Sequence, residues 1–423
     1  MGDVARQAGQ QRGPRTTTEP VGARAVGPAR VSAVPPPPRR RVRWALAGGL
    51  LVLSPVGAEY LVGYDTTTGN LPALLAGLLF FVPLYGAPAL LLREVAVRTG
   101  LRWPGVLALA AALGVVQAGV VDQSLFSLSY RHIEGWEAAA RATFVEPWGV
   151  SVANASNFLV GHAVWSFTVP IALVHALRPD AARRPWLRAP GLVVAALLYA
   201  VAALLVHVDH LETETDHAST AQVAGAWGVA ALCAVAAFAL GRRVAERRAG
   251  RVPPLAVLAA AGLVGGLLVT LSDETWTGVA QTAAVLLAAV LGLRRWSRAD
   301  GWALPHVAAV AAGALVARAA VGFLVVPLGD VPAGPKYAHN AVAVLGSVLL
   351  GWWAVRRAAR QAPGDGGGHA SDGGGRHAPS DGGGHAPDDD GQHPPVRHGV
   401  RSATDDDLRR AADDFGRGSR STP

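Results

Sequence analysis

The sequence predicts an all-α, polytopic membrane protein with about ten transmembrane helices, since a bilayer core needs roughly 20 apolar residues per span. Hydrophobic residues make up 51% of the 423 residues and charged residues only 16%, whereas a soluble domain carries about 25% charged residues. The mean hydropathy is +0.29 although both ends of the chain are polar, so the apolar residues are concentrated between residues 44 and 357. A single cysteine, Cys233, excludes a disulfide scaffold.

The net charge of +8 does not indicate a nucleic-acid partner. All 38 basic residues except Lys336 are arginine, and they form short clusters between apolar segments. That distribution is typical of membrane topology and not of one basic binding face. We therefore expect the lipid bilayer of the cell membrane as the partner, and no nucleic acid.

Residues 1–43 are basic and rich in proline, with four consecutive prolines at 35–38 followed by an arginine cluster. Such a segment cannot bury an apolar core, so a disordered cytoplasmic N-terminus is predicted. The first apolar run lacks the small-residue cleavage site of a signal peptide. We expect it to be retained as the first span.

About ten apolar segments follow, in a predicted transmembrane domain of residues 44–357. Their approximate bounds are 45–63, 71–92, 103–122, 148–176, 189–207, 220–241, 254–272, 276–293, 303–326 and 338–355. The fourth is long enough to tilt or to extend beyond the bilayer. Tryptophans near many of the ends suit an interfacial aromatic belt.

The positive-inside rule predicts the orientation. If the N-terminus is cytoplasmic, every arginine cluster between the spans falls on the cytoplasmic side; these clusters lie at 93–102, 178–188, 242–251, 294–298 and 356–360. The outer loops then hold only Arg131, Arg141 and Lys336 as basic residues, and they are rich in acids. Both ends of the chain are therefore expected in the cytoplasm.

Residues 358–423 are predicted to form a disordered cytoplasmic tail rich in glycine, aspartate and histidine. Repeats of Asp-Gly-Gly-Gly followed by histidine begin at Asp365, Asp372 and Asp381. Runs of glycine bury nothing that would offset the entropy of ordering the chain. Near the end, Thr404 begins a short amphipathic segment that it would cap as a helix.

The outer loop after the fifth span is the candidate metal site. His207, His210 and Glu214 are spaced at i, i+3 and i+7, which is one helix face, and His217 follows. Imidazole and carboxylate groups suit Zn²⁺, Mn²⁺ or Fe²⁺, so a divalent metal is the one possible cofactor. The alternative interpretation is a hydrated acidic loop.

The fourth span carries the most polar stripe. Asn154 and Asn157 lie on one side of it, and His162 lies at its edge near mid-membrane. Such groups are costly in hydrocarbon unless they face partners or water. We expect them either to line a substrate or proton path or to bond neighbouring helices.

Other spans contribute Glu59, Gln117 and Arg318 as further path candidates. Arg318 needs a carboxylate, a cavity or a route to the interface, and Glu59 and Asp122 are the carboxylates predicted at similar depth. In the second span, Pro83 and Pro88 bracket Gly86, a pattern that kinks a helix and frees backbone carbonyls. Transporters often bind substrate at such broken helices.

Two short motifs resemble the CAAX-processing and bacteriocin-protection membrane protease family. These are Glu94-Val-Ala-Val-Arg98 and Phe158-Leu-Val-Gly-His162. In that family a glutamate pair, an arginine and a histidine build the active site. Here Arg93 replaces the first glutamate, no later His-x-x-x-Asn follows, and Glu94 and His162 are predicted about 15 Å apart in depth. The resemblance is kept as an alternative only.

The leading hypothesis is transport of a small solute or cation. It rests on the kinked second span, the polar fourth span and the acidic outer loops. The alternatives are an intramembrane enzyme of the CAAX-protease type and a sensor or scaffold that acts through its tail.

Overall fold

The computed structural model describes residues 39–243 and 246–362, and 74% of these residues are helical. The only strands in these ranges are the short pair β1 (Phe144–Val145) and β2 (Val150–Ser151), in which Phe144 faces Ser151. The predictions for residues 1–38 and for 363–423, including the glycine repeats and the segment after Thr404, lie outside the described residues. The helical fold class is confirmed.

Within residues 39–243 and 246–362, eight helices are long and apolar enough to cross a membrane, as in a multi-pass membrane protein. They span Leu71–Thr99, Trp103–Val121, Val152–Leu177, Ala189–Thr213, Thr220–Gly241, Trp276–Trp296, Leu304–Val321 and Ala333–Gln361. A shorter apolar helix, α11, covers Leu255–Thr270. The first helix consists of α1 (Arg40–Pro55) and its continuation η1 (Val56–Tyr60).

Four of the helices change locally to π-helical geometry. In the first helix, the π-helical segment η1 follows α1. In the second, η2 (Val82–Gly86) lies between α2 (Leu71–Phe81) and α3 (Ala87–Thr99). In the third, η3 (Gln117–Val121) follows α4 (Trp103–Val116). The fourth is α6 (Val152–Val160), η5 (Gly161–Thr168) and α7 (Val169–Leu177). The expected break between Pro83 and Pro88 is therefore a π-helical turn inside a continuous helix.

The remaining helices are regular. They are α9 (Ala189–Thr213), α10 (Thr220–Gly241), α12 (Trp276–Trp296), α13 (Leu304–Val321) and α14 (Ala333–Gln361). Short helices occur in the loops at η4 (Tyr130–His132), α5 (Trp136–Arg141) and α8 (Pro179–Ala182). The first and last long helices extend beyond the predicted domain of 44–357, because α1 begins at Arg40 and α14 ends at Gln361.

Capping residues explain where several helices begin and end. Asn70 accepts a hydrogen bond from the Ala73 amide at the start of α2, and Ser219 forms a capping box with Gln222 at the start of α10. Gly100, with a φ of 72°, ends α3 in the left-handed conformation that favours glycine.

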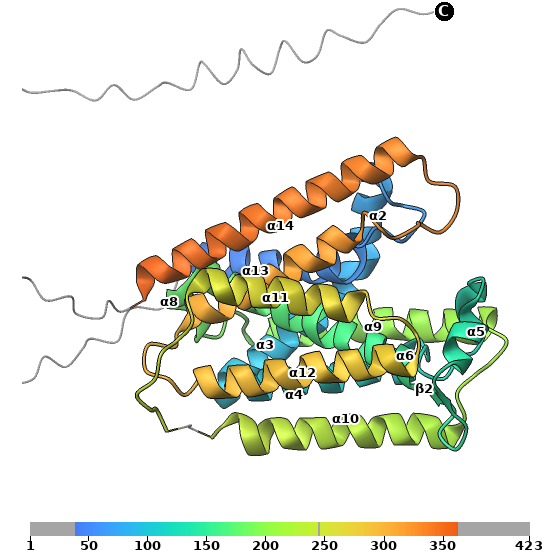
Figure 1. The fold of residues 1–423 in the computed structure, drawn as a ribbon, viewed down its shortest axis with the longest axis horizontal. Helices are drawn as coiled ribbons and strands as arrows, with labels where there is room; N and C mark the ends of the chain where they lie inside the picture. The colour runs from blue at the N-terminus through green and yellow to red at the C-terminus, as the bar shows by residue number, and fades with distance from the viewer. Residues whose placement is uncertain (1–38, 244–245, 363–423) are drawn as a thin grey trace, which may run out of the picture. The chain divides into compact units, whose positions relative to one another are not determined.

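Small residues set the closest helix packing. α13 packs against α11, α14 and α7, and α10 packs against α4 (Figure 1). A side chain at Gly262 would overlap the backbone of Val310, and one at Gly313 would overlap that of Ala259. Packing through glycine is typical of helices in lipid, where apolar side chains gain little by leaving the hydrocarbon.

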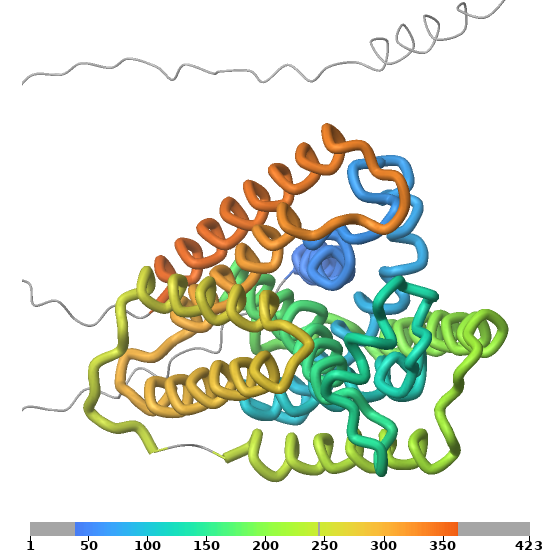
Figure 2. Tube along the Cα trace, turned by 45° about the vertical axis from the view of Figure 1, so that its right-hand side comes forward, coloured from blue at the N-terminus to red at the C-terminus, as the bar shows by residue number. Residues whose placement is uncertain are grey.

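The helices differ in how much of their apolar surface other helices cover. The most apolar window of α13 is 61% buried, whereas those of α9 and α12 are 11% buried. Exposed leucines and valines follow α9 along its length, as expected for a helix whose outer surface contacts lipid. Figure 2 shows α1 nearly end-on among the neighbouring helices.

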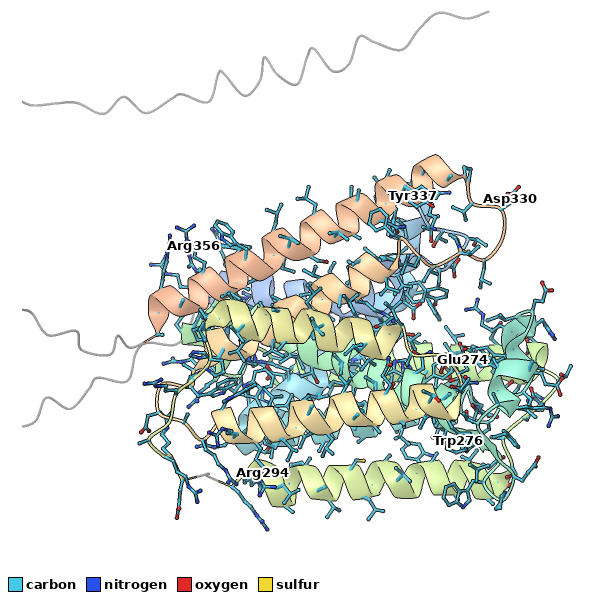
Figure 3. All side chains as sticks on the ribbon, viewed as in Figure 1. Glu274, Trp276, Arg294, Asp330, Tyr337 and Arg356 are labelled. Carbon is cyan, nitrogen blue, oxygen red and sulfur yellow. The ribbon has the colours of Figure 1, made fainter. Side chains whose placement is uncertain are left out.

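The two ends of the helices differ in charge. Figure 3 labels Arg294 and Arg356 at one end, and Glu274 and Asp330 at the other. This separation within the described residues matches the predicted segregation of arginines and acids between alternate loops.

Candidate functional site: a polar cluster at four π-helical turns

The four π-helical segments contact one another. Side-chain and backbone contacts connect η1 with η5, η2 with η5, and η3 with η2. A Cβ at Gly57 of η1 would lie 2.5 Å from the Trp165 carbonyl oxygen of η5, so only glycine permits this approach. π-helical turns are rare and occur often at functional sites, which makes their meeting point the candidate site.

The irregular helices expose backbone carbonyls that side chains satisfy. The hydroxyl of Ser54 lies 2.9 Å from the Tyr85 carbonyl oxygen and 2.5 Å from that of Ser166. The Nε2 of Gln117 donates to the Leu84 carbonyl at 3.5 Å. Side chains of two neighbouring helices thus bond to the Leu84 and Tyr85 carbonyls, between the two prolines of the second span.

The ionisable residues at this point form what we call the central cluster: Glu59, Tyr64, Tyr85, His162 and Arg318. The Tyr64 hydroxyl donates to Glu59, and Arg318 interacts electrostatically with both. The His162 ring stacks on the Tyr85 ring with centroids 5.9 Å apart, and it interacts electrostatically with Arg318. The predicted path residues Glu59, His162 and Arg318 are thus brought together.

Arg318 has an unusual environment for a cation. Its guanidinium carbon lies 5.1 Å from the centre of the Trp165 ring, a cation–π arrangement. Trp165 is fixed because its Nε1 donates to the Ala314 carbonyl at 2.9 Å. The Nε of Arg318 is buried and has no hydrogen-bond partner among the described residues. Arg318 is therefore only partly compensated by Glu59.

Asp122 and Gln117 lie next to this cluster, at the C-terminal end of α4–η3. Burial raises the pKa of Asp122 to about 6, against the lowering effect of hydrogen bonds from Ser124. Glu59 and Asp122 also interact electrostatically. The Oε1 of Gln117 accepts a hydrogen bond from the Tyr199 hydroxyl at 2.9 Å, so Gln117 connects α4–η3 with α9 as well as with η2.

The two asparagines of the fourth span do not act together. Asn154 is buried near the start of α6, where the Ser151 side chain caps its amide. Asn157 is exposed. The stripe therefore does not face one interior path along its whole length, because Asn157 points to the surface of the described residues and His162 enters the core through the π-helical turn.

The predicted metal ligands each contact other groups in the structure. Within residues 39–243 and 246–362, no group of three or more His, Cys, Asp and Glu side chains is arranged to hold a metal ion. The ring of His207 bonds to the Val120 carbonyl at 3.1 Å. The rings of His210 and His217 contact each other edge to face. The Glu214 carboxylate accepts a hydrogen bond from the Arg131 amide at 2.8 Å. The helical spacing of these residues could not predict such contacts, because the partners lie in other parts of the chain.

This acidic loop instead fixes the loop that follows Asp122. Asp216 accepts hydrogen bonds from the hydroxyls of Ser127 (2.8 Å) and Ser129 (2.5 Å) and from the Leu128 amide (2.5 Å). Arg131 and His132, both with φ of 52°, form the tight turn beside Glu214. Asp216 therefore connects the loop before α10 with the loop that follows Asp122.

Glu94, the residue of the protease resemblance, has a structural environment. It is fully buried and forms ion pairs with Arg93 at 2.5 Å and with Arg98 at 3.2 Å. It also accepts a hydrogen bond from the Trp186 amide at 2.8 Å. Arg93 donates to the Ala182 carbonyl at 2.8 Å. The pair thereby holds the loop that precedes α9.

No contact between Glu94 and His162 exists among the described residues. The intramembrane enzyme requires these two groups to meet, so the arrangement does not favour that alternative.

Sequence reasoning missed the tyrosines. Tyr64 and Tyr85 lie in the central cluster, and Tyr130 interacts with Asp122. A signal was present, because Tyr64 follows Glu59 by five residues and Tyr85 lies between the two prolines of the second span.

Comparison of the chain with protein-family models, with curated proteins and with solved structures gives no match.

Proposed function

We propose that the protein is an integral protein of the cell membrane that transports a small solute or cation and couples this transport to protons. The observation that carries the proposal is the central cluster, in which the π-helical segments η1, η2 and η5 place Glu59, Tyr85 and His162 near Tyr64 and Arg318. Ionisable groups inside a membrane domain cost free energy, and they are typical of ion paths and proton relays.

The proposal includes ten spans with both ends of the chain in the cytoplasm. The two spans beyond the eight long apolar helices would be α1–η1 and α11. The arginine clusters support this orientation, since they alternate with acidic loops. In it, Asp122 and Asp216 lie on the outer side.

The mechanism we propose is competition for the Glu59 carboxylate. The Tyr64 hydroxyl donates a hydrogen bond to this carboxylate, and Arg318 interacts with it electrostatically. A proton or a transported cation that reaches Glu59 weakens its interaction with Arg318 and leaves that guanidinium less compensated. The π-helical turns contain weaker backbone ladders than regular helix, so they are the places where the helices would rearrange in response.

Asp122 would supply protons from the outer side. Its pKa of about 6 lies near enough to neutrality for both the protonated and the charged forms to be populated. It interacts with Glu59, and its aqueous side is the acidic outer face, which attracts cations.

A flux assay tests the proposal. The full chain is reconstituted in liposomes with an acidic interior that contains a pH-sensitive dye, and Na⁺, K⁺, Mn²⁺, tetraethylammonium or an amino-acid mixture is added outside. We expect at least one solute to drive protons out faster than in protein-free liposomes. Glu59→Gln should abolish this response.

The matched control is Glu137→Gln, which removes an exposed outer carboxylate that pairs only with Arg141. It should leave the flux unchanged. Equal responses from the Glu59→Gln protein and the unaltered protein, or no proton movement with any solute, would contradict the proposal.

A further inference from the structure

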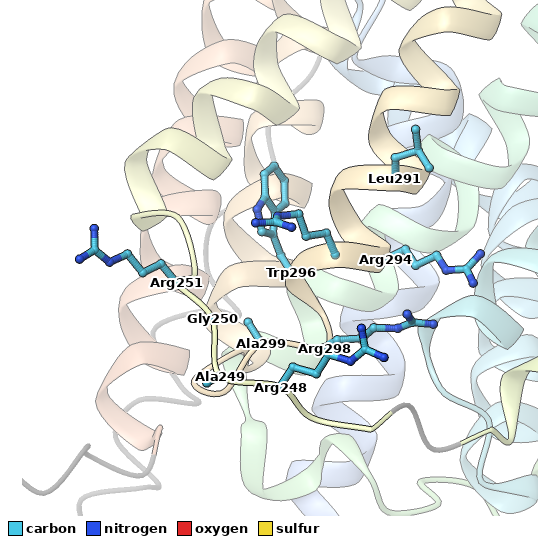
Figure 4. Close-up of a pocket in the computed structure, with 10 residues that line it drawn as sticks. Arg248, Ala249, Gly250, Arg251, Leu291, Arg294, Trp296, Arg298 and Ala299 are labelled. Carbon is cyan, nitrogen blue, oxygen red and sulfur yellow. The ribbon is translucent and has the colours of Figure 1, made fainter.

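Two loops at the arginine-rich end of the helices are joined through their backbones. The Arg248 amide donates to the Arg298 carbonyl at 2.8 Å, and the Asp300 amide donates to the Arg248 carbonyl at 3.1 Å. These bonds form a short parallel bridge between the α10–α11 loop and the α12–α13 loop. The two loops and the end of α12 enclose a pocket of about 360 Å³ (Figure 4).

Positive charge dominates this pocket. Its lining includes Arg248, Arg251, Arg294, Arg295 and Arg298, and it includes no carboxylate. Within the described ranges, none of these five side chains forms an ion pair. Like charges this close repel one another, so a bound anion would stabilise the arrangement.

The guanidinium groups also share a direction. In Figure 4 the side chains of Arg248, Arg294 and Arg298 extend to the same side, whereas Arg251 extends away from them. Planar guanidinium groups bind phosphate oxygens through paired hydrogen bonds. Phosphate is therefore the anion whose chemistry fits this group best.

The pocket lies at the end of an apolar helix that has tryptophan at both ends, Trp276 and Trp296. Tryptophan is enriched where a membrane meets water, at the level of the lipid headgroups. Arg294 and Arg295 are in the last turn of α12, and Trp296 itself lines the pocket. This places the arginines at headgroup depth when α12 crosses the bilayer.

An apolar surface continues from the pocket along α12. Leu291, which lines the pocket, is 57% exposed. Its neighbour Val290 and Leu287, which lies about one turn further along α12, are each 59% exposed. A soluble phosphate compound would use the arginines alone. A phospholipid would use both surfaces, with its phosphate on the arginines and its acyl chains along α12.

We propose that this pocket binds the headgroup of an anionic phospholipid. The number of arginines favours a headgroup with two phosphates, as in cardiolipin, over one with a single phosphate such as phosphatidylglycerol. This lipid site does not depend on the transport proposal, since no residue of the central cluster takes part in it.

Native mass spectrometry of the delipidated full chain tests the proposal by titration with cardiolipin, phosphatidylglycerol and phosphatidylcholine. The pocket variant is Arg248→Gln/Arg294→Gln/Arg298→Gln. The control variant, Arg242→Gln/Arg243→Gln/Arg247→Gln, removes the same charge from the same loop but outside the pocket lining. Thermal unfolding without lipid checks that both variants fold.

We expect cardiolipin to bind the unaltered chain and the control variant equally, and to bind the pocket variant at least about tenfold more weakly, because three charge-assisted contacts are lost. A variant with Lys at the same three positions keeps the charge but loses the paired donors, so it should show an intermediate affinity. Because it preserves the net charge, it also tests the site if the Gln variant does not fold.

Two results would overturn the proposal. Equal weakening in the pocket and control variants would mean that total charge, and not the pocket, attracts lipid. Displacement of cardiolipin by inorganic pyrophosphate at equal concentration, without a preference for anionic lipid over phosphatidylcholine, would assign the pocket to a soluble phosphate compound.

Discussion

The carboxylates of Asp216 and Asp122 show how surroundings shift the pKa of one residue type in opposite directions. Burial alone raises the pKa of Asp216, but hydrogen bonds from Ser129, Leu128 and Ser127 outweigh it and hold this pKa below its usual value. At Asp122, burial outweighs the bonds from Ser124 and the pKa rises to about 6. Asp216 is therefore suited to anchoring a loop, and Asp122 to binding a proton.

Asp216→Asn should destabilise the loop that follows Asp122. The amide retains the shape but loses the charge that strengthens bonds from the two serine hydroxyls and the Leu128 amide, at a cost of roughly 1–2 kcal/mol. Thermal unfolding in detergent measures the difference. Asp209→Asn is the control, because that carboxylate is exposed and accepts no hydrogen bond from the described residues.

The pH dependence of this effect has a definite sign. The pKa of Asp216 is lower in the folded state, so its stabilisation is fully present above the unfolded pKa of about 3.9 and is lost as the pH falls through the lower folded value. The difference between the unaltered protein and Asp216→Asn should therefore shrink only in acid. A difference that grows in acid would be inconsistent with this assignment.

Ser124→Ala should raise the pKa of Asp122 further above 6, because the Ser124 hydroxyl is one of the groups that lower it. Infrared spectroscopy of the protonated carboxyl group, with Asp122→Asn as the reference, follows the titration. Ser127→Ala changes a serine of the same loop that bonds to Asp216 instead, and it should leave this titration unchanged. A titration midpoint near the ordinary aspartate value in the unaltered protein would refute the buried position of Asp122.

At the scale of single helices, composition predicted where helices occur better than how they bend. The apolar lengths of α9, α10 and α12 follow from the sequence, since a bilayer-length run leaves few alternatives. The Pro83–Gly86 pattern predicted a disturbance in the second span. The π-helical turns η3 and η5 contain no proline and were not predicted, because their geometry depends on neighbours that are distant in sequence.

Gly86→Ala tests the importance of the π-helical meeting point. The added Cβ would overlap the backbone of Leu51, so α1 and η2 must separate, at a cost of roughly 1–3 kcal/mol. Proton flux should fall together with thermal stability. Gly49→Ala is the control in α1, because nothing lies within 4 Å of a Cβ there, and it should be neutral or stabilising by up to ~1 kcal/mol. Equal stability of the two variants would show that the close approach is unimportant.

At the scale of the whole molecule, the site was predictable in part. Glu59, His162 and Arg318 were identified because ionisable groups are rare in apolar segments, and the structure gathers them. Asn157 and the histidines at the end of α9 were chosen by helical spacing, which describes one helix and says nothing of its neighbours. The tyrosines were missed for the same reason, since their partners lie on other helices.

Cysteine accessibility tests the transport account most directly, because a transporter must open its site to each side in turn. Ser166→Cys in a Cys233→Ser background places one thiol beside His162, whose Nδ1 lies 3.5 Å from the Ser166 hydroxyl. Asp330→Cys and Ser297→Cys serve as exposed controls in loops at opposite ends of the helices.

We predict that a membrane-impermeant thiol reagent labels the Ser166→Cys protein both in right-side-out and in inside-out vesicles. Each control should react in one vesicle orientation only, with Asp330→Cys and Ser297→Cys reacting in opposite ones. Labelling of the Ser166→Cys protein from a single side, or from neither, would contradict alternating access to the central cluster.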